Sequence, residues 1–73
     1  MLDKWVRTSR TDWFSLSSPP MWGRLWNLLT EPMDQYDIML RLNSLFPVKL
    51  DYFATLDLLR DCEKAGVIER WKE

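Results

Sequence analysis

The C-terminal third of the chain has the clearest alternation of apolar and polar positions. Leu56, Leu59 and Cys62 recur at helical spacing, and most residues between them are charged. Gly66 follows directly, and glycine readily adopts the positive φ with which many helices end. The apolar residues after it favour an extended backbone. The pattern therefore predicts a helix from near Lys49 or Asp51 to Ala65, then a strand from Val67 to about Lys72.

Two more helices are predicted upstream, and prolines mark their limits. Ser18 can cap the first, with Pro19 at its first position, where no backbone N–H is needed. Pro32 ends it, because the residue before a proline avoids the α region. Asp34 is a good N-cap for the second helix. The first helix then runs roughly from Pro19 to Thr30, and the second from about Gln35 to Ser44, with an apolar stripe of Tyr36, Ile38, Met39, Leu42 and Leu45.

Residues 2–17 lack helical periodicity but are rich in strand-forming side chains. Trp5 and Val6 precede a polar stretch, and Trp13 and Phe14 follow it. One interpretation is a β-hairpin. The other is a tail whose tryptophans hold it against the helices. Either way, the tryptophans are expected to pack rather than to stand free in solvent.

Three segments together resemble the winged helix-turn-helix domain of small bacterial and archaeal regulators. They are Arg24-Leu-Trp-Asn-Leu-Leu-Thr-Glu-Pro32, Tyr36-Asp-Ile-Met-Leu-Arg-Leu-Asn43 and Leu59-Arg-Asp-Cys-Glu-Lys-Ala-Gly-Val-Ile-Glu-Arg70. The resemblance covers roughly residues 24–71. It implies an α+β winged-helix domain, with three helices and a small antiparallel β-sheet, in which the third helix enters the DNA major groove.

The chain departs from that pattern in three places. Cys62 stands where the family has a leucine, and no second wing strand follows Arg70. The helix face that would meet DNA carries Asp57 and Asp61, which repel phosphate. The absence of a second wing strand after Arg70 suggests that a strand from residues 2–17 pairs with the C-terminal strand, so that both chain ends build the sheet. The alternative fold is a three-helix bundle with a disordered N-terminal tail.

Composition narrows the possible functions. The 73 residues make a single domain, and 47% apolar residues with five tryptophans can supply a core. With one cysteine and no histidine, the chain lacks an internal disulfide, the usual Cys/His zinc site and a histidine-activated nucleophile. Two glycines are too few for a glycine-rich phosphate loop. We therefore expect no enzyme activity, no cofactor and no metal. Neither a membrane span nor a signal peptide is recognised, and a cytoplasmic location is expected.

Two functions remain. The first is a DNA-binding transcriptional regulator, which would act as a homodimer because a lone module with few basic contacts binds weakly. The second is a protein–protein interaction module on the same fold, favoured by the net charge of −1 and the many aromatic residues. Tyr52 and Phe53 are adjacent, so one is expected to pack inward and the other to be exposed. The candidate DNA-contacting residues are Lys49, Tyr52, Phe53, Thr55 and Arg60 on the third helix, with Arg70 and Lys72 on the wing.

Overall fold

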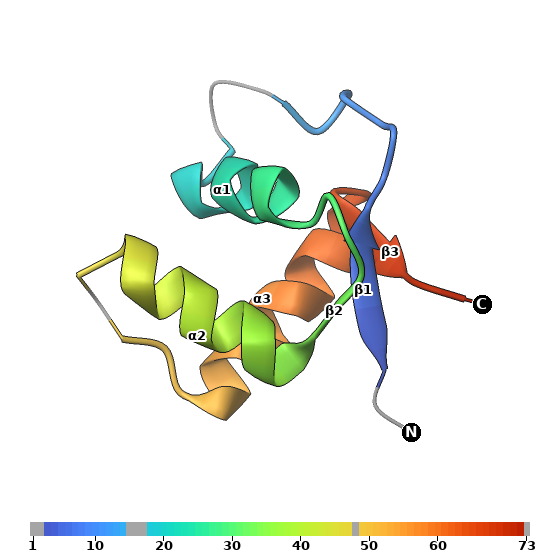
Figure 1. Cartoon of the computed structure of the whole chain (residues 1–73). Helices are drawn as coiled ribbons and strands as arrows, with labels where there is room; N and C mark the ends of the chain where they lie inside the picture. Colours follow the sequence, from blue (N-terminus) through green and yellow to red (C-terminus); the bar gives the residue numbers. More distant parts are fainter. Residues whose placement is uncertain (1–2, 15–17, 48, 73) are drawn as a thin grey trace.

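The protein is α+β, with three helices and a small three-stranded antiparallel sheet (Figure 1). A computed structural model describes residues 3–14, 18–47 and 49–72. This layout is compatible with a winged helix. In chain order the elements are β1 (Lys4–Arg7), α1 (Pro20–Leu28), β2 (Met33–Asp34), α2 (Gln35–Leu45), α3 (Tyr52–Ala65) and β3 (Ile68–Arg70).

The N-terminal strand β1 lies in the centre of the sheet, in the order β2-β1-β3. Its Trp5 is opposite Met33 on β2 and opposite Arg70 on β3, and both pairings are antiparallel. The expected pairing between the two chain ends is therefore confirmed. The predicted hairpin is wrong for residues 3–14, which contain one strand whose partners lie elsewhere in the chain. The rest of that prediction, residues 2 and 15–17, lies outside the described residues.

Helix α1 begins one residue later than predicted. Pro20 occupies its first turn, and Pro19 is the extended residue before it, with φ −58° and ψ 137°. Ser18 does not cap the helix, because its hydroxyl donates a hydrogen bond to the Trp13 carbonyl. The prediction chose the wrong one of two adjacent prolines. Either residue satisfies the rule that the first helical position needs no N–H donor.

The caps of the other two helices follow local rules. The Asp34 carboxylate accepts a hydrogen bond from the Asp37 N–H at 2.8 Å, as predicted for α2. Asp51 does the same for the Ala54 N–H at 2.6 Å at the start of α3. Gly66 ends α3 with φ 87°, which confirms the predicted glycine cap. Each cap satisfies backbone groups that the helix itself leaves unpaired.

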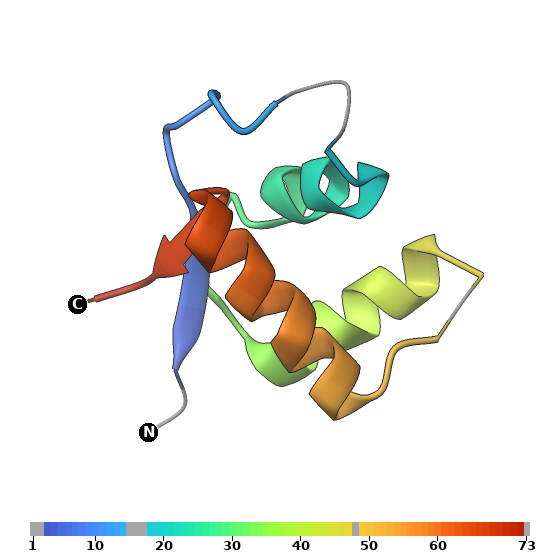
Figure 2. The ribbon, with the colours of Figure 1, turned by 180° about the vertical axis from the view of Figure 1, so that it is seen from behind.

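Helix α3 contributes the central wall of the core, packed against α1, α2 and the sheet. Figure 2, seen from behind, shows its whole length between the other helices and the strands. The sheet covers one end of the helices, so the three-helix bundle with a disordered tail is not the fold. The predicted α2 stripe is partly wrong, because Tyr36 and Leu45 are exposed. The buried apolar residues are Trp5, Trp13, Leu25, Leu29, Ile38, Leu42, Leu59, Cys62, Val67 and Ile68.

Residues 8–13, which we call the N-terminal clasp, run from β1 over the end of α3 toward α1. The Thr8 hydroxyl donates a hydrogen bond to the Gly66 carbonyl, and the Thr8 backbone carbonyl accepts one from Trp26 Nε1 at 3.0 Å. Trp13 is buried and donates its Nε1–H to the Arg10 carbonyl at 2.8 Å. The indole N–H groups of Trp13 and Trp26 thus donate to backbone carbonyls of the clasp, and they hold this irregular segment against the helices.

Candidate interaction surface

Five large apolar side chains are exposed on α2 and at the start of α3, and four of them lie apart from Leu45 at the C-terminal end of α2. Tyr36 is 54% exposed and Leu40 48% on α2, while Tyr52 is 46% and Phe53 76% exposed on α3. We call these four residues the apolar face. Single exposed apolar residues are ordinary on protein surfaces, but several on adjacent elements mark sites of interaction.

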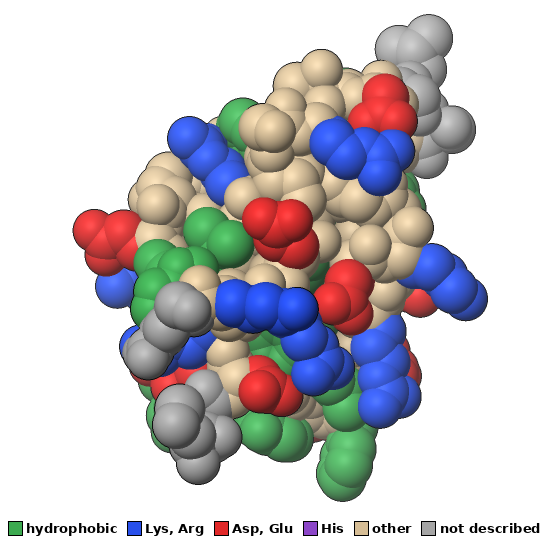
Figure 3. All heavy atoms as spheres, turned by 90° about the vertical axis from the view of Figure 1, so that its right-hand side faces the viewer, with side chains coloured by type: hydrophobic (Ala, Val, Ile, Leu, Met, Phe, Trp, Pro, Cys, Tyr) green, Lys and Arg blue, Asp and Glu red, His purple; other side chains and the backbone are tan. Residues whose placement is uncertain are grey.

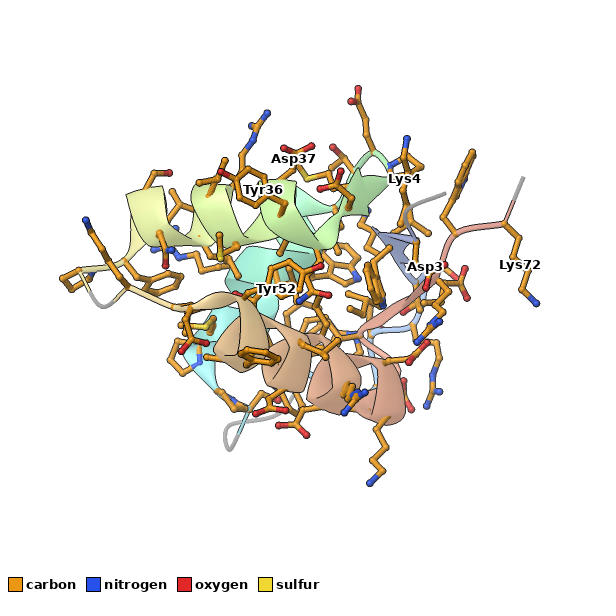
Figure 4. The ribbon with its side chains drawn as sticks, turned by 90° about the horizontal axis from the view of Figure 1, so that it is seen from below. Asp3, Lys4, Tyr36, Asp37, Tyr52 and Lys72 are labelled. Atoms are coloured by element: carbon orange, nitrogen blue, oxygen red, sulfur yellow. The ribbon has the colours of Figure 1, made fainter. Side chains whose placement is uncertain are left out.

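Side-chain hydrogen bonds fix the flank of α2 against the start of α3. Gln35 Nε2 donates to the Tyr52 carbonyl at 2.9 Å. The Asn43 amide bridges to Leu50, donating to its carbonyl at 2.9 Å and accepting from its N–H at 2.6 Å. Tyr36 on α2 and Tyr52 at the start of α3 are both visible in the view from below in Figure 4.

The prediction that one of Tyr52 and Phe53 packs inward is wrong. Both side chains are exposed, with ring centroids 6.4 Å apart and ring planes at 85°. The inward position in this turn belongs to Thr55, which is fully buried and donates its hydroxyl to the Asp51 carbonyl at 2.8 Å. Because Thr55 does not reach the surface, it is not available for the DNA contact expected from the sequence.

The remaining candidate DNA-contacting residues are spread along the molecule. Lys49 precedes α3, and Arg60 is exposed on its outer face. Arg70 forms ion pairs with Asp3 at 3.1 Å and Glu63 at 3.6 Å. Lys72 lies beyond β3 (Figure 4). The arrangement therefore places these cations at separate points, and Arg70 already faces two carboxylates.

The exposed charges are of mixed sign. On α3, Asp57 and Asp61 alternate with Arg60 and Lys64, and all four are exposed. The face that carries the strand ends shows the same mixture, with basic and acidic side chains interspersed (Figure 3). Phosphate binding favours a concentration of positive charge, which neither surface has.

Three further kinds of site were considered in the described residues, a reactive thiol, a metal site and a membrane-spanning helix. Cys62 is buried, and burial, followed by the charge of Asp61, raises the pKa of its thiol to about 12. A thiol with that pKa is protonated and unreactive at neutral pH. No group of three or more His, Cys, Asp or Glu side chains there could hold a metal ion. No helix in the same ranges has the length and apolar character needed to cross a membrane.

Comparisons with protein-family models, with curated proteins and with solved structures find no match to this chain. The function is therefore inferred from the surface itself. Sequence reasoning singled out Tyr52 and Phe53 but missed Tyr36 and Leu40. Leu40 offered a signal, because it lies outside the apolar stripe of α2 and so has no place in the core.

Proposed function

We propose that this chain is a small protein–protein interaction module that docks a protein partner through its apolar face. The observation that carries the proposal is the exposure of Tyr36, Leu40, Tyr52 and Phe53 on two adjacent helices. Aromatic side chains are enriched at interfaces and often supply much of the binding energy. Hydrogen bonds from Gln35 to the Tyr52 carbonyl and from Asn43 to the Leu50 carbonyl join α2 to the chain at the start of α3, so the two helices that carry these side chains are held together before a partner arrives, which lowers the entropic cost of binding.

The proposal is tested by capturing proteins from a cell extract on the immobilised chain. A double variant, Tyr52→Ser with Phe53→Ser, is expected to lose any protein that the wild type retains. The matched control is Leu45→Ser, which removes an equally exposed apolar side chain from α2 outside the apolar face. Equal retention by the wild type and the double variant would remove the apolar face as the docking site.

A DNA-binding regulator is the second candidate. The winged-helix-compatible layout favours it, with Arg60 exposed on α3 and Lys49 exposed just before that helix. The acidic neighbours Asp57 and Asp61 weigh against it.

Titration with duplex DNA at two salt concentrations separates the two candidates. Under our proposal the chain does not bind DNA even at low salt. Binding that weakens steeply with salt, and that Arg60→Ala reduces, would favour the regulator instead.

A further inference from the structure

The outer face of α3 carries a line of four exposed side chains at the spacing of a helix–helix contact. Phe53, Asp57, Arg60 and Lys64 are separated by four, three and four positions, which keeps them on one side of the helix. We call this line the α3 seam. It faces away from the buried side of α3, which consists of Thr55, Leu59 and Cys62.

The seam is complementary to itself when two copies run antiparallel. A two-fold axis between Leu58 and Leu59 places Asp57 opposite Arg60 of the second copy. By the same symmetry, Arg60 lies opposite Asp57 of the second copy, so the pair is formed twice. The same axis places Phe53 opposite the second copy's Lys64, whose alkyl stem and ammonium group both suit an aromatic ring. In the described part of the chain, Asp57, Arg60 and Lys64 make no ion pair that would compete.

A shallow, open hollow lies beside the seam. It has a volume of about 300 Å³ and is lined by Trp22 of α1 and by Asp61, Lys64 and Ala65 of α3. In the antiparallel arrangement Phe53 reaches the level of Lys64 on the other copy, next to this hollow. Phe53 is 76% exposed in the single chain, so the contact would remove a large apolar surface from water.

We propose that α3 pairs antiparallel with α3 of a second copy of this chain along the α3 seam. This inference rests on the proposed function through Phe53, the residue that the α3 seam shares with the apolar face, and it names the partner. A strongly basic partner would leave Arg60 and Lys64 unmatched, and a strongly acidic partner would leave Asp57 unmatched. Parallel pairing would set Asp57 against Asp57 and Arg60 against Arg60, so charge selects the antiparallel orientation.

The expected dimer is weak. The seam spans 12 residues, and the 11 steps between its ends cover roughly 16 Å of helix at 1.5 Å per residue. Such a contact is smaller than a standard interface, so we expect a dissociation constant on the order of 10–100 μM.

Sedimentation velocity over about 5–500 μM protein, a range that brackets this affinity, tests the proposal. The wild type is expected to shift from monomer to dimer. Asp57→Arg and Arg60→Asp should each weaken dimerisation at least about tenfold, since each places like charges opposite one another twice. The control is Arg41→Asp, a charge reversal of the same kind on α2, which should dimerise as the wild type does.

Restoration of the charge pairs makes the test specific for the register. The double variant Asp57→Arg with Arg60→Asp should regain dimerisation, because both pairs re-form with exchanged signs. A mixture of the two single variants should form heterodimers, although neither variant dimerises alone. Circular dichroism confirms that each variant is folded.

A wild type that remains monomeric over the whole concentration range would overturn self-pairing. A dimer that the single charge reversals do not weaken would also overturn it, and so would a double variant that does not regain dimerisation. These outcomes are distinct from failure of the proposed function. A monomer that still captures another protein through Tyr52 and Phe53 would retain the docking role and lose only the second copy as its partner. DNA binding would overturn the docking role. It would not change the sedimentation result, because that experiment contains no DNA.

Discussion

The two ends of α3 differ in how they are used. At its C-terminal end, the N-terminal clasp and the sheet cover the helix, and hydrogen bonds join residues far apart in sequence, such as Thr8 and Gly66. At its N-terminal end, the bonds are local or join α2 to α3, and Tyr52 and Phe53 are left in solvent. The buried side of the C-terminal end is joined to the rest of the fold, whereas the N-terminal end leaves two aromatic rings free to bind.

This difference suggests that stability and recognition can be changed separately. Substitutions at the covered end should lower the free energy of unfolding. They should therefore affect every surface of the molecule, because each surface depends on the folded state. Substitutions at the open end should alter association and leave unfolding unchanged. Four measurements test this division, from the largest expected effect on stability to the smallest.

The largest effect is expected from removal of residues 1–7. The truncation deletes β1, the central strand, so β2 and β3 lose their partner and Trp5 is lost from the core. We expect loss of the cooperative thermal transition by circular dichroism. Removal of residues 72–73, which lie beyond the last strand, is the control. An unchanged melting temperature after the first deletion would show that the covered end is dispensable.

The second effect is expected from Gly66→Ala. The residue has φ 87°, and a side chain in that conformation costs about 1–2 kcal/mol. An added Cβ would also lie 2.7 Å from Arg10 Nη1, so the end of that flexible side chain must move aside. Melting temperature should fall by roughly 10 °C for a domain of this size. Gly23→Ala, with no heavy atom within 4 Å of the new Cβ, should instead stabilise α1 by about 0.5–1 kcal/mol.

The third effect is a pH dependence at the covered end. Burial raises the pKa of the Cys62 thiol from 9.0 to about 12, so the folded state holds this proton more tightly than the unfolded state. The contribution to stability is therefore complete below pH 9 and is lost as pH rises through about 12. Urea unfolding at pH 8 and pH 10 should show a smaller decline in Cys62→Val than in the wild type. Equal declines in the wild type and in Cys62→Val would show that burial does not protect the Cys62 thiol.

The smallest effect on stability is expected from Phe53→Ser. The side chain is 76% exposed, and substitutions at such positions usually change the free energy of unfolding by less than about 0.5 kcal/mol. Association should nevertheless weaken in the sedimentation experiment. A Phe53→Ser variant with a markedly lower urea midpoint would contradict the separation of the two ends.

Local rules account for the parts of the fold that the sequence predicted. The Asp34 cap and the Gly66 stop depend on backbone groups within a few residues, so their chemistry is readable from neighbours. The two-residue strand β2 is too short for any periodicity and forms because β1 lies beside it. The exposure of Tyr36 and Leu45 likewise depends on which other elements cover α2, and a pattern within α2 does not contain that information.

The candidate surface was predictable to a smaller extent. Tyr52 and Phe53 were recognised as unusual, but the inward position was given to one of them instead of to Thr55. Threonine takes that position because its methyl group packs in the core while its hydroxyl bonds back to the Asp51 carbonyl one turn earlier. The spacing of Thr55 four residues before Leu59 was the available signal. Because threonine is polar, it was not counted among the apolar positions of the helix.

The central position of β1 has a consequence for the order in which the protein is made. The ribosome releases β1 before any helix and β3 after all of them. Trp5 therefore emerges long before Arg70, the residue opposite it in the sheet. During synthesis the helices are complete while β1 still lacks its C-terminal neighbour. The sheet closes last, through contacts distant in sequence, and such contacts form slowly.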